Sequence, residues 1–229
     1  MAGSHRVAIV GAGMGGLATA AALRRVGIEV AVYEQATQFA RIGAGIQIGC
    51  NAMKVLRELG LERRLRAQSF YPRSWNNRDW RTGEIKFDMI FGESAERKFG
   101  APYLLAHRGD LHAALATAVP AECVKLGHKL VGLDEVGDSV RLSFANGATA
   151  LADAVVGADG VHSLVREFLF GTSPVNFTVL TLQSRIPPSS CELSTRNCIG
   201  HSGQGVNGDR MSGGFGRSSN WVMHAAPCR

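Results

Sequence analysis

The 229-residue sequence lacks several features that would assign it to a class at once. It contains no run of about 18 consecutive apolar residues, so we expect no membrane-spanning helix and no membrane partner. The N-terminus carries no signal-peptide pattern, because the short apolar run 7–10 meets Gly11 at once. No Cys-x-x-Cys pair occurs and the number of cysteines is odd. We therefore predict no metal site, and reduced thiols in a cytoplasmic protein.

Charged residues are also scarce, at 19% of the sequence, and they carry a net charge of +6 with an isoelectric point near 9.4. Such a basic balance is typical of nucleic-acid partners, but the Lys and Arg residues are scattered. The densest group is Arg63, Arg64 and Arg66, which we interpret as a solvated helix face. Steering of an anionic substrate or cofactor is the alternative. We predict no nucleic-acid partner, and the sequence indicates no oligomeric state.

Composition divides the sequence into two parts. Residues 5–171 show α/β patterning, in which apolar runs and helical periods are separated by glycine-rich turns. Residues 172–229 contain no Lys, and Gly, Ser, Pro and Asn fill 24 of these 58 positions. Because their apolar residues keep neither helix nor strand periodicity for long, we predict an irregular tail without a functional site.

The first part alternates strands and helices. Residues 72–106 show only weak, interrupted strand signals, and a helix is expected from residue 161. We expect buried strands over 5–10, 28–33 and 154–157, helices over 14–26, 51–59 and 110–119, and a half-buried strand over 140–145 before a turn at Asn146-Gly147.

A glycine-rich motif, Gly11-Ala-Gly13-Met-Gly15-Gly16, follows the first strand and opens the first helix. Gly11 permits a tight turn, Gly13 removes the Cβ that would block a pyrophosphate, and Gly16 lets the helix pack close to the strand. The helix N-terminus offers free N–H groups to phosphates. Glu34 ends the second strand, where a carboxylate suits ribose hydroxyls. These features predict a dinucleotide site, the alternative being a glycine-rich structural turn.

Three further segments carry candidate chemistry. Asp159-Gly160 follows the strand at 154–157, so its carboxylate lies at the edge of the sheet where ligands of α/β folds bind. The alternative is a cap on the next helix, made by Asp159 or Ser163. Residues 41–51 hold three closely spaced glycines, which otherwise indicate a flexible surface loop. Residues 107–112 read His-Arg-Gly-Asp-Leu-His and open a helix.

In order and spacing these motifs resemble those of the group A flavoprotein aromatic hydroxylases, which include the salicylate hydroxylases and the 6-hydroxynicotinate 3-monooxygenases. The resemblance implies an α/β fold: a Rossmann-like FAD-binding domain of the GR2 type, with a parallel sheet and a small antiparallel β-meander. It implies FAD as cofactor and NADH or NADPH as reductant. It also implies a monooxygenase that uses O₂ to hydroxylate a small aromatic acid.

The same resemblance implies roles for individual residues. Gln47 is expected to face the substrate. Independently of the resemblance, the residues themselves favour Asp110 as a helix cap and His112 as an ordinary helix residue. The cofactor-binding positions that the resemblance and the glycine motif imply are Gly11, Gly13, Gly15, Gly16, Glu34, Gln35, Arg41, Arg108, Leu130 and Asp159.

The sequence departs from the family in its second half. Family members are much longer, the resemblance stops near Phe177, and the family's second flavin motif, Gly-Asp-Ala-x-His-Pro, does not occur. We therefore expect a truncated or frameshifted product without the C-terminal half of the family fold. Two other functions stay open: an inactive FAD- or ADP-binding fragment, and an NAD-binding Rossmann reductase.

Overall fold

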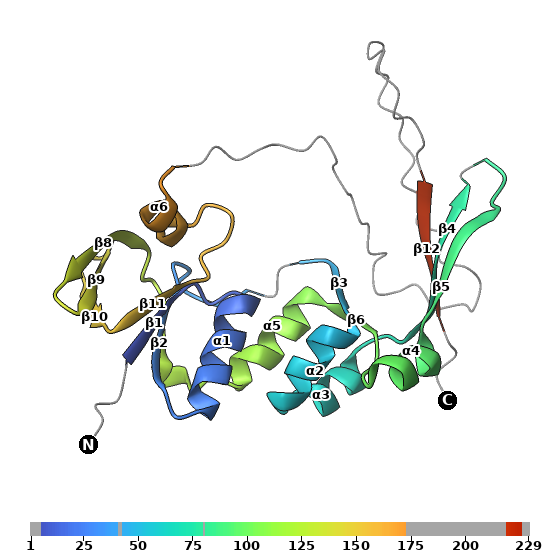
Figure 1. Ribbon diagram of the computed structural model, residues 1–229, viewed down its shortest axis with the longest axis horizontal. Coiled ribbons are helices and arrows are strands. Elements are labelled where there is room, and N and C mark those ends of the chain that lie inside the picture. Colours follow the sequence, from blue (N-terminus) through green and yellow to red (C-terminus); the bar gives the residue numbers. More distant parts are fainter. Residues whose placement is uncertain (1–5, 41–42, 80, 173–218, 226–229) are drawn as a thin grey trace, which may run out of the picture. The chain divides into compact units, whose positions relative to one another are not determined.

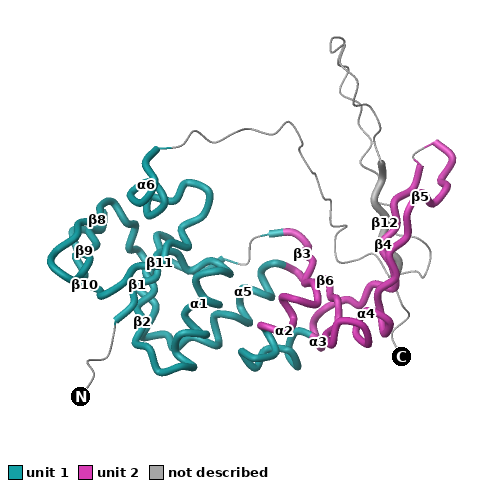
Figure 2. Tube along the Cα trace, in the orientation of Figure 1, with its two compact units in different colours: residues 1–43, 56–65, 108–178 teal, residues 44–55, 66–107, 179–229 magenta. Residues whose placement is uncertain are grey.

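The computed structural model describes residues 6–40, 43–79, 81–172 and, for the backbone alone, 219–225. The chain divides into two compact units, which Figure 2 shows in teal and magenta. The first unit comprises residues 1–43, 56–65 and 108–178, and the second comprises residues 44–55, 66–107 and 179–229. Each unit is thus built from segments that are far apart in the sequence.

The first unit contains a four-stranded parallel sheet in the order β11-β1-β2-β7 (Figure 1). Val10, at the end of β1, lies opposite Tyr33 of β2 and Gly157 of β11. The carboxyl ends of these three strands therefore meet at one edge of the sheet. The strands are β1 (Arg6–Val10), β2 (Glu29–Tyr33), β7 (Val124–Lys125) and β11 (Ala154–Gly157).

One helix packs beside this sheet, and a second helix packs on the first. α1 (Met14–Arg25) follows β1 and contacts β1, β2 and α5 (Arg108–Thr117). Small and apolar side chains on both helices are buried in this contact, which allows the helices to approach closely. The chain leaves α1 through Gly27, whose φ of +81° favours glycine. The buried residues include Leu17, Ala20, Ala21, Leu111, Ala114 and Leu115.

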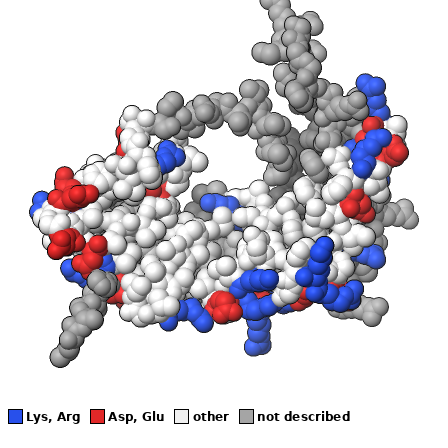
Figure 3. Space-filling model, viewed as in Figure 1, with Lys and Arg blue, Asp and Glu red and all other residues white. Residues whose placement is uncertain are grey.

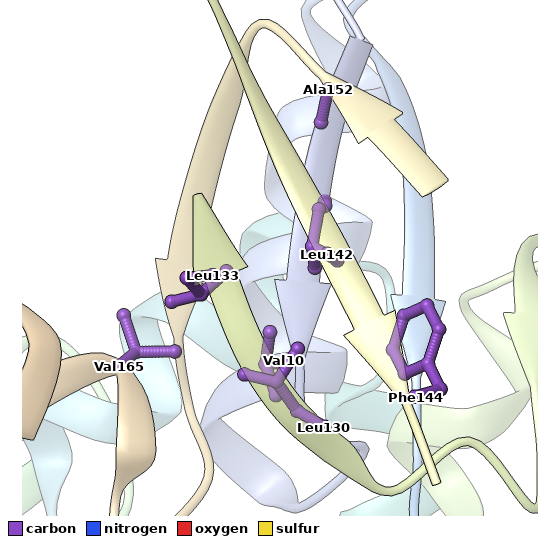
Figure 4. Close-up of a cluster of buried hydrophobic side chains, with 8 residues drawn as sticks. Val10, Leu130, Leu133, Leu142, Phe144, Ala152 and Val165 are labelled. Atoms are coloured by element: carbon purple, nitrogen blue, oxygen red, sulfur yellow. The ribbon is translucent and has the colours of Figure 1, made fainter. Parts of the chain in front are cut away.

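A three-stranded antiparallel meander and the short helix α6 (Leu164–Phe170) complete the first unit. Its β9–β10 turn is tight, because the Gly147 amide donates to the Phe144 carbonyl at 3.0 Å and Gly147 has a φ of +83°. The meander packs on β1 and α6 through the apolar cluster in Figure 4. Its strands are β8 (Leu130–Val136), β9 (Ser139–Phe144) and β10 (Thr149–Ala152), and the cluster is Ala8, Val10, Leu130, Leu133, Leu142, Phe144, Ala152 and Val165.

The second unit holds two antiparallel sheets. One pairs β3 with β6, and the other has the order β12-β4-β5. α2 and α3 each have residues in both units, and a short 3₁₀ turn over Ala121–Cys123 belongs to the first. The elements are β3 (Gly45–Ile48), α2 (Cys50–Glu58), α3 (Glu62–Gln68), β4 (Pro72–Asp79), β5 (Ile85–Ile90), α4 (Gly92–Phe99), β6 (Leu104–His107) and β12 (Ser219–Ala225).

The structure differs from the sequence-based expectations in several places. α2 begins at Cys50, one residue before the predicted start, and α5 begins at Arg108, so Asp110 lies in its first turn and is not its cap. The strands β3 and β8 were not predicted. Gly92–Phe99 forms α4 inside a stretch where only strand signals were expected. Within the predicted tail, Ser219–Ala225 pairs with β4 as β12, because backbone pairing does not require the apolar alternation that the tail lacks. Most of that tail, including 173–218, lies outside the described residues.

The basic group at 63–66 lies on α3 with mixed exposure. Arg63 is exposed, whereas Arg64 and Arg66 are half-buried, because Leu65 between them is buried. Arg64 donates to the Thr117 hydroxyl at 3.2 Å, and Arg66 forms an ion pair with Glu96. On the face in Figure 3, acidic side chains accompany the basic ones within each unit.

None of the helices in the described residues combines the length and the apolar character that a membrane span requires.

Candidate functional site

The glycine loop between β1 and α1 contains two positions that exclude any side chain. A Cβ at Gly11 would lie 2.4 Å from the carbonyl oxygen of Ala158, and Gly11 has a φ of +100°. A Cβ at Gly16 would lie 1.9 Å from the carbonyl oxygen of Gly11. Because all of these neighbours are backbone atoms, the fold itself requires glycine at Gly11 and Gly16.

The other two glycines of the loop face open space. A Cβ at Gly13 or at Gly15 would meet no atom within 4 Å. Gly13 is the N-cap of α1 without a side-chain hydrogen bond, and the first intrahelical bond runs from the Leu17 amide to the Gly13 carbonyl at 3.0 Å. The amides of the first turn thus have no acceptor within the helix. Open backbone beside free amides fits the phosphates of a dinucleotide.

Glu34 lies beside this loop, where β2 ends, and backbone amides hold its carboxylate in place. Oε2 accepts from the Ala12 amide at 2.7 Å, and Oε1 accepts from the Ala36 amide at 2.9 Å. A carboxylate oxygen has two lone pairs, so each oxygen can still accept from a ribose hydroxyl. The neighbouring Gln35 is exposed.

The carbonyl of Ala12 has a side-chain partner too. His112 of α5 places Nε2 at 2.8 Å from this oxygen. Because a carbonyl only accepts, Nε2 carries the hydrogen in this bond. The Phe39 ring meets the imidazole edge-on, with centroids 4.8 Å apart. The sequence analysis treated His112 as an ordinary helix residue, since no local signal links it to a loop 100 positions away.

α5 begins at Arg108, which the sequence analysis assigned to the cofactor. A Cβ at Gly43 would lie 2.9 Å from the Cβ of Arg108, so the missing side chain of Gly43 leaves the room that Arg108 takes. Gly43 has a φ of +140°, a further reason for glycine there. Arg41, the other predicted arginine of this loop, lies outside the described residues.

Asp159 lies next to the glycine loop and accepts from the first amides of α6, whose N-cap is Ser163, with its hydroxyl accepting from the Arg166 amide at 2.9 Å. Its Oδ2 accepts from the amides of Leu164 at 2.8 Å and Val165 at 3.3 Å, and its Oδ1 accepts from the Ser163 hydroxyl at 2.5 Å. A Cβ on Gly11 would come within 3.1 Å of the Asp159 Cα. The capping role weighed in the sequence analysis is therefore present, at a position that also adjoins Gly11.

Leu130 belongs to the apolar cluster and is 8% exposed. Its side chain is thus engaged in the core of the first unit, and any contact to a cofactor would have to come from its backbone. The glycine motif, Glu34, Arg108 and Asp159 share that unit with Leu130.

Gln47 belongs to the second unit, on the exposed face of β3. The Tyr103 phenol donates to Gln47 Oε1 at 2.6 Å. Burial raises the pKa of this phenol, so it stays protonated and able to donate in neutral solution. Phe91 stacks on the Tyr103 ring with centroids 4.0 Å apart. Tyr103 uses one lone pair of Oε1, so Gln47 can offer its two N–H donors and the second lone pair of Oε1 to another partner.

No group of three or more His, Cys, Asp or Glu side chains that could hold a metal ion occurs in the described part of the chain. Cys50 is half-buried and Cys123 is buried, and both are free thiols. Burial raises the pKa of the Cys50 thiol, which disfavours the reactive thiolate.

Comparison with known proteins agrees with this geometry. The family described as FAD binding domain matches residues 4–186. The chain is 44% identical over 178 residues to 6-hydroxynicotinate 3-monooxygenase of Bordetella bronchiseptica. This alignment covers 78% of this chain and 46% of that protein. It is 43% identical over 169 residues to 3-amino-4-hydroxybenzoate 2-monooxygenase of Streptomyces cremeus, an alignment that covers 74% of this chain and 43% of that protein.

Solved structures give the same picture. Klebsiella pneumoniae HpxO, complexed with FAD and uric acid, superposes with a TM-score of 0.67 at 27% identity, covering 76% of this chain and 44% of that one. The 2,6-dihydroxypyridine-3-hydroxylase from Arthrobacter nicotinovorans superposes with a TM-score of 0.61 at 31% identity, covering 75% and 41%. The chain thus spans less than half the length of these relatives.

Proposed function

The chain belongs to the FAD binding domain family, and from that premise we propose that it is part of an FAD-dependent aromatic hydroxylase. In this proposal the substrate is a small aromatic acid resembling salicylate or 6-hydroxynicotinate, O₂ is the oxidant, and NADH or NADPH is the reductant. The observation that carries it is the glycine loop, where Gly13 leaves open backbone beside the uncapped start of α1.

In this proposal, different residues around the loop contact different parts of FAD. The amides of the first turn of α1, beside Gly13 and Gly15, bind the pyrophosphate, and Glu34 accepts from the ribose of the adenosine half. Arg108 is one turn from His112 on α5, where its positive charge favours the phosphates. Asp159 and the backbone of Gln35 and Leu130 complete the proposed set.

FAD, when bound, supplies the transfer of electrons from the nicotinamide and the reaction with O₂. The side chains of this chain then hold the substrate. In this proposal Gln47 donates a hydrogen bond to an acceptor on the substrate, a carboxylate or a ring oxygen, while the bond from Tyr103 to its carbonyl oxygen fixes the orientation of the amide. This arrangement favours substrates that carry an anionic or carbonyl oxygen.

A second candidate is cofactor binding without turnover. The described residues supply phosphate and ribose contacts from one unit, while Gln47 is the one substrate-facing residue that the sequence analysis identified. In this second candidate function the chain binds FAD or ADP but does not hydroxylate a substrate. An NAD-dependent reductase has less support, because the matching relatives are monooxygenases and an FAD complex is among the similar structures.

The test is the flavin content of the purified full chain, measured by absorbance, followed by NADH oxidation with and without 6-hydroxynicotinate or salicylate. Bound flavin with substrate-stimulated oxidation supports the hydroxylase. Bound flavin without stimulation supports the binding-only candidate. A chain that binds NAD but neither FAD nor ADP contradicts the proposal and favours the reductase. The Gly13→Ala variant is the matched control, since it is expected to remove flavin binding while keeping the fold.

A further inference from the structure

We propose that His112 is a positioning residue for the cofactor, because it sets the direction of the amide that follows Ala12. The inference rests on the proposed function, in that it concerns the same glycine loop. His112 lies on α5, outside the motif, and its Nε2 donates to the Ala12 carbonyl at 2.8 Å.

The geometry of the peptide bond carries the argument. The Ala12 carbonyl and the Gly13 N–H belong to one planar trans peptide, so they point in opposite directions. When His112 binds the carbonyl, the Gly13 N–H is turned away from His112. Gly13 is also the residue whose missing side chain leaves open space next to the helix start. The bond therefore presents a donor on the open side of the loop.

Without this bond the peptide is free to turn. Gly13 has a φ of −69°, and rotation of the Ala12–Gly13 peptide would carry that angle to positive values. Glycine tolerates both regions almost equally, so the loop sequence alone does not select one orientation. A flipped peptide would present a carbonyl oxygen, which repels a phosphate, in place of the amide.

Both ends of Ala12 are held by side chains from distant segments. Its amide donates to Glu34 Oε2 at 2.7 Å, and its carbonyl accepts from His112. Phe39, edge-on to the imidazole at 4.8 Å, restricts the ring. The loop is thus arranged before a ligand arrives, which lowers the entropy lost on binding.

The experiment measures dissociation constants of the full chain for FAD, by quenching of flavin fluorescence, and for ADP, by calorimetry. His112→Phe keeps an aromatic ring beside Phe39 but has no donor, and we expect it to raise both constants about three- to tenfold, as for loss of one hydrogen bond. His112→Gln keeps an N–H at a similar reach and is expected to stay within about twofold of the wild type.

Two controls separate positioning from general damage. Thr117→Val removes two side-chain hydrogen bonds elsewhere on α5 and is expected to leave both constants unchanged. The urea midpoint of each ligand-free variant reports its stability. If His112→Phe does not fold, His112→Asn takes its place, because its shorter side chain cannot reach the carbonyl.

In ligand-free protein, the Gly13 amide resonance in an ¹H–¹⁵N spectrum is expected to broaden or shift in His112→Phe and to return in His112→Gln. The proposal is overturned if His112→Phe binds ADP within twofold of the wild type, or if His112→Gln is as weak as His112→Phe. If the wild-type chain binds neither FAD nor ADP, the proposed function itself fails, and the wild-type titration alone reveals that outcome.

Discussion

Alanine at Gly16 is expected to destabilise the fold, whereas alanine at Gly13 is expected to weaken cofactor binding. At Gly16 the new Cβ would lie 1.9 Å from the Gly11 carbonyl oxygen, and an ordinary contact begins at 3.4 Å. The backbone must therefore open by about 1.5 Å, since no side chain can move aside. Gly11 at the start of the motif and Gly16 at its end would therefore move apart.

The magnitude follows from two opposing terms. Forcing a methyl group into a packed site costs about 3 kcal/mol at the upper end of the usual range, and alanine in a helix returns up to about 1 kcal/mol. The net loss for Gly16→Ala is about 2 kcal/mol, which lowers the Tm of a chain of this size by about 4–8 °C.

Gly13→Ala behaves differently, because its φ of −69° suits any residue and its Cβ would meet nothing within 4 Å. Its stability should stay within about 0.5 kcal/mol of the wild type. The Cβ would, however, occupy the space proposed for the pyrophosphate. We expect the Kd for FAD to rise at least about tenfold.

Urea unfolding of ligand-free protein and FAD titration of the same samples test both expectations. The reasoning is refuted if Gly16→Ala is as stable as the wild type, or if Gly13→Ala binds FAD with unchanged affinity. If Gly13→Ala lost stability and Gly16→Ala lost only FAD affinity, Gly13 would be the packed position of the loop and Gly16 the one that faces open space.

The remaining predictions concern Asp159 and Tyr103. Asp159→Ala should cost about 1–2 kcal/mol in urea unfolding, because the amides of Leu164 and Val165 lose their acceptor while Ser163 stays as the N-cap of α6, and a loss below about 0.5 kcal/mol would contradict that role. Tyr103→Phe should raise the Kd for 6-hydroxynicotinate about two- to tenfold by freeing Gln47, with FAD binding unchanged, and calorimetry with both ligands decides this. Because burial raises its pKa, Tyr103 should titrate above its usual range in an absorbance titration that compares wild type with Tyr103→Phe. A difference spectrum that is complete by pH 10 would refute the burial argument. The contribution of the protonated phenol to stability should be complete below about pH 10 and should be lost as pH rises through the raised pKa.

Elements with a strong local signal were predicted well. The strand over 154–157 was confirmed at both ends, and the helix over 14–26 was confirmed to within one residue, because glycines and apolar periods mark their limits. α4 was missed, since Gly92–Phe99 is short and polar and lies between strands. Its helical state depends on Ala95 packing into the second unit and on Gly100, which ends it with a φ of +72°.

The candidate site shows the same division. The spacing of Gly11, Gly13 and Gly16 indicated a dinucleotide site, and the geometry distinguishes the two glycines that the fold needs from the one that faces open space. For Asp159 the sequence left two roles open, and the hydrogen bonds show that it accepts from the first amides of α6, beside the N-cap Ser163. His112 had no signal, because its partner is a backbone carbonyl, which any residue carries.

Local spacing and residue type were enough to predict the glycine loop, the strands and helix that flank it, and the family to which the chain belongs, whereas β3, α4 and β8 were not predicted. Which groups meet depends on the tertiary structure: Glu34 and His112 contact the two ends of Ala12, and Tyr103 contacts Gln47. These contacts join residues 22 to 100 positions apart, and a hydrogen bond across such a distance depends on how strands and helices pack.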